Sequence, residues 1–305
     1  MGLKSRNILG LRAMCRQDME LILTEAKRWK ESGLKAEGKP LAGKSIINFF
    51  IEPSTRTRIS FELAGKRLGA EVVNFSANSS SLLKGEGLEE TAETLQAMAV
   101  DLLVVRHAAA GVPARLAEIL NLHVINAGDG AHEHPTQALL DIFTIKEKLG
   151  TVQGRKIVIV GDIIHSRVAR SNIWGLQKLG AQVAVVGPAT LLPPGLEALG
   201  VEVSTRLEAV LPGADVVNVL RLQQERQRSG LLPSLADYSF QYRITKERLA
   251  LTGKDTLVLH PGPMNLEVEI TKEVAASSQS VINEQVTNGV AVRMAILNLI
   301  LGGKN

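Results

Sequence analysis

A buried strand is indicated by Lys44-Ser45-Ile46-Ile47-Asn48-Phe49-Phe50-Ile51, a short apolar run with a glycine before it and a proline after it. Apolar residues then recur at helical spacing from Ile59 to Leu68, and Gly69 is placed to end that helix. A strand that leads directly into a helix is the building unit of a parallel sheet covered by helices. This stretch therefore predicts an α/β fold.

The same alternation continues along nearly the whole chain. Further strands are predicted at 71–75, 102–105, 123–126, 156–162, 183–186, 201–203, 215–220 and 256–259. Further helices are predicted at 18–30, 134–149, 168–179 and 284–301. A length of 305 residues allows about two domains. We therefore predict two domains, each a parallel sheet flanked by helices.

The domain boundary is expected near 150–154, where two glycines follow the predicted helix. We expect a first domain over residues 1–150 and a second over residues 151–283. The apolar segment 284–305 is predicted to form a C-terminal helix that returns to the first domain.

Composition excludes several classes of protein. Hydrophobic residues make up 45% of the chain and charged residues 22%, which is typical of a globular protein and not of a disordered one. The net charge of +4 is small, and ten aromatic residues (six Phe, two Trp and two Tyr) give little surface for base stacking, so we expect no nucleic-acid partner. Cys15 is the one cysteine, which excludes an internal disulfide and a thiolate metal site and favours a reducing compartment. No apolar run reaches roughly 18 residues and no signal peptide is recognisable, so we expect a cytoplasmic protein without a membrane partner.

The segment Ser54-Thr55-Arg56-Thr57-Arg58 is a candidate anion site. It follows the first predicted strand and opens a helix, and ligands of parallel sheets lie at such strand ends. Hydroxyls, backbone N–H groups and guanidinium groups at the positive end of a helix dipole suit a phosphate. An ordinary Ser/Thr helix cap with exposed arginines is the alternative. The chain lacks G-x-x-x-x-G-K-[ST], which argues against a nucleotide-binding P-loop.

Arginine or histidine follows several other predicted strands. These residues are Arg106 and His107, His132 and His134, Arg167 and Arg170, Arg221, and His260. Each alone could be a solvated or paired surface charge. The His-x-His pair could suggest a metal, but no third ligand with a recognisable spacing supports one, and Gly161-Asp162 lacks the G-x-G-x-x-G of a dinucleotide site. Because cationic residues recur at strand ends in both halves, we expect a highly anionic substrate to bind between the domains.

Together these segments resemble the transcarbamoylase family over essentially the whole chain. The segment 54–58 resembles the carbamoyl-phosphate motif of that family, and His134-Pro135-Thr136-Gln137 is similar to its second motif. Three segments resemble the aspartate-using branch more than the ornithine-using branch: Lys84-Gly85-Glu86, the stretch 162–171, and His260-Pro261-Gly262-Pro263, which stands where ornithine-using members carry His-Cys-Leu-Pro. The segment 283–290 also resembles the family. Two departures are Gly87, where the family usually has Ser or Thr, and Leu266-Glu267, where many bacterial members have Arg-Gly.

The resemblance implies transfer of the carbamoyl group of carbamoyl phosphate to the amine of L-aspartate, an early step of pyrimidine synthesis that needs no cofactor and no metal. It implies that the first domain binds carbamoyl phosphate and the second binds aspartate. It assigns the phosphate to Ser54, Thr55, Arg56 and Thr57. It assigns polarisation of the carbonyl to Thr57, Arg106 and His134, and the carbamoyl amide to Gln137.

In the second domain the resemblance assigns the two carboxylates of aspartate to Arg167 and Arg221, with Gln223 assisting. It implies that Pro261, Gly262 and Pro263 complete the carbamoyl-phosphate pocket. It also implies that Lys84 reaches the site of a neighbouring subunit, where its charge would contact both substrates. A shared site implies a homotrimer, whereas sequence alone would favour a solvated loop lysine. A different amino acid acceptor and a catalytically silent assembly partner are the alternatives, and association with a regulatory chain or a dihydroorotase stays open.

Overall fold

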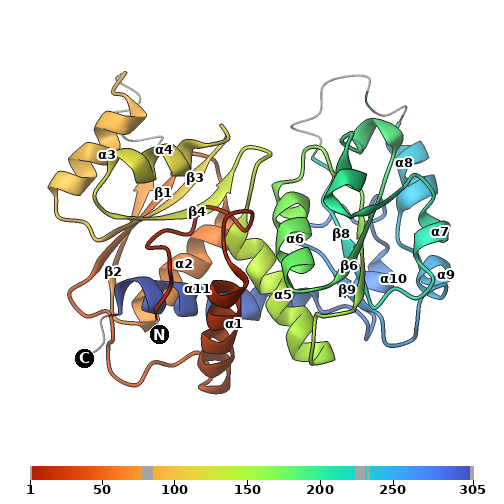
Figure 1. Ribbon diagram of the computed structural model, residues 1–305, viewed down its shortest axis with the longest axis horizontal. Coiled ribbons are helices and arrows are strands. Elements are labelled where there is room, and N and C mark those ends of the chain that lie inside the picture. The colour runs from red at the N-terminus through yellow and green to blue at the C-terminus, as the bar shows by residue number, and fades with distance from the viewer. Residues whose placement is uncertain (1, 77–84, 224–230, 232–233, 303–305) are drawn as a thin grey trace. The chain divides into compact units, whose positions relative to one another are not determined.

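The computed structural model describes residues 2–76, 85–223, 231 and 234–302, and these divide into two compact units (Figure 1). The first unit comprises Met1–Leu140 and Thr287–Asn305, and the second comprises Asp141–Val286. Each unit is built on its own parallel sheet.

The first unit contains a four-stranded parallel sheet in the order β2-β1-β3-β4. Three of its strands, β1, β3 and β4, are buried over most of their length, as is typical where helices cover both faces of a parallel sheet. The bounds of the strands are β1 (Ser45–Phe50), β2 (Glu71–Ser76), β3 (Leu102–His107) and β4 (His123–Asp129). Its helices are α1 (Arg16–Glu31), α2 (Thr55–Arg67), α3 (Leu88–Ala97), α4 (Val112–Ile119), the start of α5 (Pro135–Leu149) and most of α11 (Ile282–Leu301).

The C-terminal helix α11 belongs largely to the first unit, although it follows the whole second unit in the sequence. The guanidinium of Arg293 on α11 lies 5.1 Å from the ring centroid of Phe61 on α2. The predicted fold class is therefore confirmed, including the return of the C-terminal helix.

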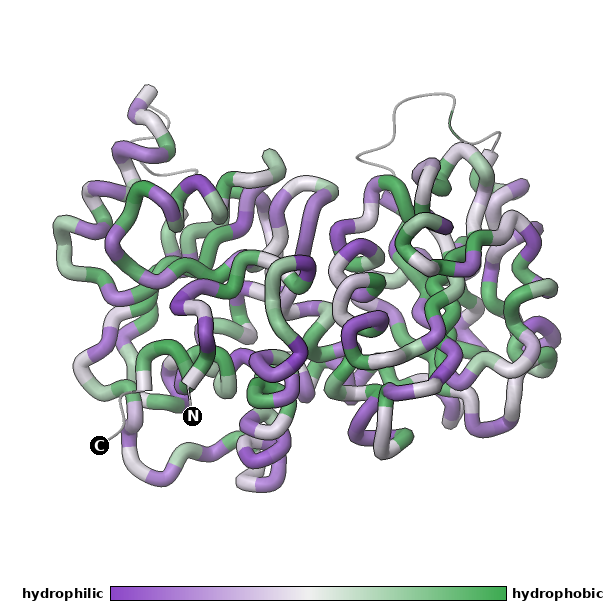
Figure 2. Tube along the Cα trace, in the orientation of Figure 1, coloured by the Kyte–Doolittle hydropathy of each residue, from purple (hydrophilic) through white to green (hydrophobic). Residues whose placement is uncertain are grey.

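The second unit contains a five-stranded parallel sheet in the order β7-β6-β5-β8-β9. Figure 2 shows hydrophobic residues along its strands, whose side chains form a buried core on the sheet. The strands are β5 (Lys156–Val160), β6 (Gln182–Val186), β7 (Glu202–Ser204), β8 (Val216–Val219) and β9 (Leu257–Leu259). The helices are α6 (Arg167–Lys178), η3 (Ala189–Leu191), η4 (Leu196–Leu199), α7 (Leu207–Val210), α8 (Leu235–Tyr242), α9 (Lys246–Leu249) and α10 (Lys272–Ala275).

Asp101 fixes the edge of the first sheet at which β1 and β3 begin. Its carboxylate accepts hydrogen bonds of 2.8 Å from Lys44 Nζ and from the N–H of Ser45. Burial raises the pKa of the Asp101 carboxyl, but the hydrogen bonds from Lys44 and Ser45 outweigh it and hold this pKa below its ordinary value. Asp101 thus joins the starts of two neighbouring strands.

The variant Asp101→Asn should lower the free energy of unfolding by about 1 kcal/mol at neutral pH, a modest value because water screens a partly exposed ion pair. Since the folded-state pKa of Asp101 is lowered, its contribution is present above the ordinary carboxyl pKa of about 4 and is lost as the pH falls through the lowered value. Urea unfolding of both proteins at several pH values should therefore show their stabilities converging below about pH 4. The control Glu89→Gln, which breaks an ion pair with Arg115 at the surface, should leave stability nearly unchanged. A constant difference between Asp101→Asn and the wild type across this pH range would contradict the linkage.

Candidate active site

Each sheet has one point at which the order of strands reverses along the chain. In the first sheet β1 lies between β2 and β3, and in the second sheet β5 lies between β6 and β8. The loops that follow the two strands at such a point diverge and leave a crevice for ligands at the carboxyl ends of the strands. In the first unit the loop after β1 leads to Ser54 and the start of α2, and Arg106 lies near the end of β3. In the second unit the loop after β5 leads to Arg167, the first residue of α6, and Arg221 follows β8.

The start of α2 has two features that suit an anion. Ser54 occupies the N-cap position, but its side chain accepts no capping hydrogen bond from the helix. The first turn contains Arg56 and Arg58 and no acidic residue, although the positive end of a helix dipole favours acidic groups there. By contrast, Ser166 caps α6 by accepting a hydrogen bond of 3.0 Å from the N–H of Ala169. This geometry favours anion binding at α2 over the ordinary cap.

Arg106 lies beside the loop that follows β1. Its backbone carbonyl accepts hydrogen bonds from the N–H groups of Ile51 and Glu52, which fold that loop against the end of β3. Its Nη2 donates to Glu52 Oε1 at 2.7 Å, and its Nη1 donates to the carbonyl of Ala127 at 3.3 Å. Glu52 thus holds the guanidinium at the strand ends while both side chains stay mostly buried.

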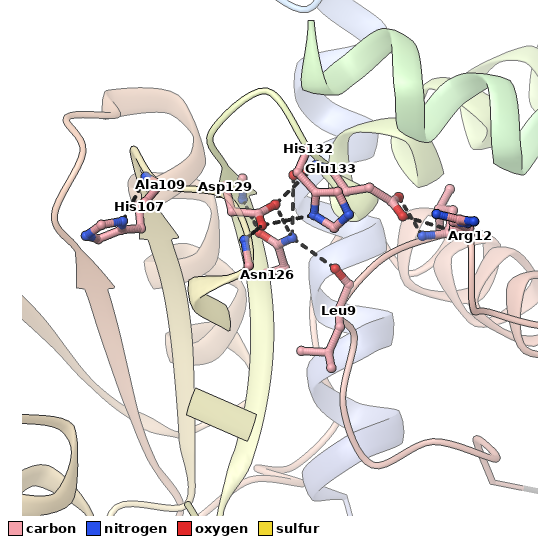
Figure 3. A network of polar contacts seen from close by, with 11 residues as sticks. Leu9, Arg12, His107, Ala109, Asn126, Asp129, His132 and Glu133 are labelled. Carbon is pink, nitrogen blue, oxygen red and sulfur yellow. Dashed lines mark hydrogen bonds and ion pairs between the residues drawn. The ribbon is translucent and has the colours of Figure 1, made fainter. Parts of the chain in front are cut away.

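His134 directly precedes Pro135, the first residue of α5, and its side chain is buried. Its carbonyl accepts a hydrogen bond of 3.0 Å from the N–H of Gln137, which is also buried. The buried carboxylate of Asp129 shapes the preceding turn by accepting hydrogen bonds from Asn126 Nδ2, the N–H groups of Gly111 and Glu133, and His132. Figure 3 shows Asn126, Asp129 and His132 pointing toward one another in this turn. The turn therefore fixes the position of His134 directly before α5.

Glu133 joins this turn to the N-terminal segment. Its buried carboxylate accepts hydrogen bonds from the N–H of Leu11 at 2.7 Å and of Arg12 at 3.1 Å (Figure 3). Gly10 lies against this carboxylate, and a Cβ at that position would clash with Glu133 Oε1 unless the buried side chain shifted. The N-terminal segment thus supports the residue next to His134.

In the second unit, Arg167 is the first residue of α6 and is buried. The turn before it begins at Gly161, whose φ of +125° requires glycine, and continues with the buried Asp162. Asp162 Oδ1 accepts a hydrogen bond from the N–H of His165 at 3.2 Å and lies 2.9 Å from His165 Nδ1. These contacts close the turn that carries Arg167.

Arg221 and Gln223 follow β8, and the segment 260–263 follows the neighbouring strand β9. The N–H of Leu220 still donates to the carbonyl of Val160, so Arg221 comes directly after the last contact with the sheet. Parallel pairing of β5 with β8 and of β8 with β9 brings Arg167, Arg221, Gln223, Gly262 and Pro263 to one edge of the second sheet.

The structure therefore brings most of the predicted site residues together, as one group in each unit. The first unit gathers Ser54, Thr55, Arg56, Thr57, Arg106, His134 and Gln137 at the carboxyl ends of β1, β3 and β4. Lys84 lies outside the described residues. The sequence interpretation missed the supporting acids Glu52, Asp129, Glu133 and Glu269. The one local signal for such a role was a carboxylate placed directly after a strand, as in Glu52.

Across 2–76, 85–223, 231 and 234–302, His, Cys, Asp and Glu form no group of three or more that could hold a metal ion. Within the same residues, no helix has the length and apolar character needed to cross a membrane.

Two parallel α/β units, each with arginines at the strand ends beside its switch point, define a two-domain protein of the class that binds anionic small molecules. Comparison with known families identifies the class more closely. Residues 6–147 match the carbamoyl-P binding domain of aspartate/ornithine carbamoyltransferases, and residues 153–300 match their Asp/Orn binding domain. The chain belongs to the aspartate/ornithine carbamoyltransferase family, as its sequence predicted.

Individual relatives match over nearly their full length. The chain is 56% identical over 307 residues to the aspartate carbamoyltransferase catalytic subunit of Moorella thermoacetica, covering 100% of both chains. It is 58% identical over 301 residues to that of Desulforamulus reducens, covering 98% of this chain and 96% of the relative.

Solved structures show the same fold. The aspartate transcarbamoylase of Trypanosoma cruzi in complex with N-(phosphonacetyl)-L-aspartic acid matches with a TM-score of 0.89 and 33% identity, over 98% of this chain and 97% of the other. The ornithine carbamoyltransferase of Pyrococcus furiosus matches with a TM-score of 0.90 and 29% identity over 100% of both chains.

Proposed function

We propose that this chain transfers the carbamoyl group of carbamoyl phosphate to the amine of L-aspartate, giving N-carbamoyl-L-aspartate and phosphate for pyrimidine synthesis. The observation that carries the choice of acceptor is the placement of Arg167 and Arg221 after the neighbouring strands β5 and β8. Two guanidinium groups suit the two carboxylates of aspartate, whereas ornithine has a cationic side chain. Relatives named for the aspartate reaction, at 56% and 58% identity, support the same choice.

The proposed reaction needs an uncharged amine and a polarised carbonyl. The amine nitrogen attacks the carbamoyl carbon to form a C–N bond and a tetrahedral intermediate with charge on the former carbonyl oxygen. The C=O bond then forms again, the bond from carbon to the phosphate oxygen breaks, and the leaving phosphate takes the electron pair and accepts the proton that the amine nitrogen loses. Ser54, Thr55, Arg56 and Thr57 hold the phosphate in this proposal. Donors from Thr57, Arg106 and His134 stabilise the oxygen charge, and Gln137 orients the amide.

The acceptor side of the proposed site belongs to the second unit. Arg167 and Arg221 bind the carboxylates of aspartate, and Gln223 assists. Carbonyl groups at Pro261, Gly262 and Pro263 are available to the amine groups of the substrates. These residues follow β5, β8 and β9, which pair as neighbours in one sheet.

A direct assay tests this function. The purified chain is incubated with carbamoyl phosphate and either aspartate or ornithine, and the carbamoylated product is identified by mass. We expect rapid transfer to aspartate and little to ornithine. Transfer to ornithine at the higher rate, or to neither acceptor, would contradict the proposal.

We further propose a cytoplasmic homotrimer with sites shared between subunits. The resemblance of Lys84-Gly85-Glu86 to the lysine-bearing loop supports sharing, and a single cysteine, Cys15, suits a reducing compartment. A native mass of about three times 32.8 kDa is expected for the trimer. A larger mass on copurification would indicate a regulatory chain or a dihydroorotase.

Mixing two inactive variants tests the shared site. Lys84→Ala and Arg56→Ala oligomers should each be nearly inactive, and mixed oligomers should regain activity. An Arg56→Ala chain supplies an intact Lys84 to a neighbour that retains Arg56, which rebuilds one complete site. The two variants are dissociated, reassembled together and assayed for transfer to aspartate. Mixed oligomers without any gain in activity would place both residues in one chain's site.

A further inference from the structure

Glu269 has a fully buried carboxylate in the second unit, outside the residues assigned to either substrate. Its Oε1 accepts hydrogen bonds of 2.6 Å from the N–H of Leu222 and from Asn265 Nδ2. Its Oε2 accepts from the N–H of Asn265 at 3.1 Å and from His260 Nε2 at 2.8 Å. A buried carboxylate is costly unless donors surround it, and Glu269 has four.

The hydrogen bonds of His260 show which of its ring nitrogens carries the proton. His260 Nδ1 accepts a hydrogen bond of 2.8 Å from the N–H of Gly262, so that nitrogen carries no proton. The proton of the neutral ring is therefore on Nε2, which donates to Glu269. All four donors to the carboxylate are thus uncharged groups, and Glu269 acts only as an acceptor.

The four donors come from two segments that have left the sheet. The strands β8 and β9 end at Val219 and Leu259, so neither Leu222 nor the stretch 260–265 is held by strand pairing. Leu222 lies between Arg221 and Gln223, and its side chain is fully buried. The hydrogen bond that the N–H of Leu222 donates to Glu269 fixes the peptide group that joins Leu222 to Arg221.

We propose that Glu269 is a positioning residue for the dicarboxylate acceptor: its carboxylate holds the segment 221–223 and the loop 260–265 in one arrangement and so sets the affinity for aspartate. This inference rests on the proposed function for the identity of the acceptor. Glu269 is not among the residues assigned to either substrate, and it acts through the backbone beside Arg221 and through His260 beside Gly262.

The variant Glu269→Gln keeps the shape of the side chain and removes one acceptor. The amide nitrogen of the glutamine would replace one carboxylate oxygen and face two N–H donors, either those of Leu222 and Asn265 or those of His260 and Asn265. Since the amide nitrogen is itself a donor, those two hydrogen bonds would be lost. We expect the KM for aspartate to rise about tenfold or more. The affinity for carbamoyl phosphate, followed by calorimetry, should fall by a smaller factor, because only residues 261–263 of those assigned to it lie on the loop that Glu269 holds. Hydrogen exchange at residues 220–223 should become faster.

The matched control is Thr256→Val, at the opposite end of β9. Thr256 is buried, and its Oγ1 donates to the carbonyl of Ala214 at 2.7 Å and accepts from the N–H of Gly253 at 3.0 Å. The control should lower stability while it leaves the KM for aspartate and the exchange at 220–223 unchanged. Equal changes in KM in both variants would overturn the positioning role.

If Glu269→Gln does not fold, Asn265→Ala gives the same test. It removes the side-chain donor to Glu269 Oε1, which also donates to the carbonyl of Leu222 at 3.4 Å, and leaves the carboxylate otherwise surrounded. A smaller rise in the KM for aspartate with faster exchange at 220–223 would support the proposal, and wild-type values of both would overturn it. A wild-type chain inactive toward aspartate would instead contradict the proposed function, and the exchange at 220–223 would still decide whether Glu269 holds the segment.

Discussion

Replacing Arg56 with alanine should lower the turnover of carbamoyl transfer about 10²–10³-fold while the protein stays folded. Arg56 lies in the first turn of α2, where Ser54 makes no capping hydrogen bond and no acidic side chain offsets the helix dipole. Because its side chain is exposed, the substitution removes a donor to the leaving phosphate without opening a cavity. Steady-state kinetics with both substrates, together with a thermal melt, measures the two effects separately.

The control for this prediction is Arg67→Ala. Arg67 is also exposed, but it is the last residue of α2, at the end opposite to the predicted phosphate site. Its loss should leave turnover close to that of the wild type. Near-normal turnover in a folded Arg56→Ala protein would remove Arg56 from the phosphate site.

The succession of strands and helices along the chain could be predicted from the sequence. Both faces of each sheet are covered, so the strands appear in the sequence as apolar runs. Six α-helices of the described residues, α3, α4, α7, α8, α9 and α10, were not predicted. The helix α4 has only eight residues and contains Pro113 in its first turn, and α8 also has eight, so neither shows the long apolar period of helices such as α1. Their place is set by packing on the sheet and by neighbouring loops.

The candidate site also contains residues that could be predicted from the sequence and residues that could not. Residues that would touch substrate, such as Arg56, stand at the ends of recognisable strands, and the resemblance of short segments was enough to name them. The residues that hold them in place gave no such signal: Glu269 lies between two apolar residues, and its partner Leu222 is 47 positions away. Contacts over that separation depend on the order of strands in the sheet, which local patterns do not specify.

The variant Arg106→Ala should lower turnover by at least about 10³-fold, which is more than the loss expected for Arg56→Ala. It removes a donor to the developing charge on the carbonyl oxygen, and it also leaves Glu52 without the guanidinium that lies 2.7 Å from it. The Glu52 side chain is mostly buried, so its negative charge would then face an anionic substrate with little screening.

The double variant Arg106→Ala/Glu52→Gln separates these two effects. Glutamine keeps the size of the side chain and removes its charge, so the double variant should be about tenfold more active than Arg106→Ala alone. The single variant Glu52→Gln should lose less activity than Arg106→Ala, because the guanidinium keeps its hydrogen bond to the carbonyl of Ala127. A double-mutant cycle on kcat/KM measures the coupling between the two side chains. Additive losses would show that Glu52 and Arg106 contribute to catalysis independently of each other. A double variant more active than the sum of the two single losses predicts would show that Glu52 and Arg106 act as one unit in binding the anion.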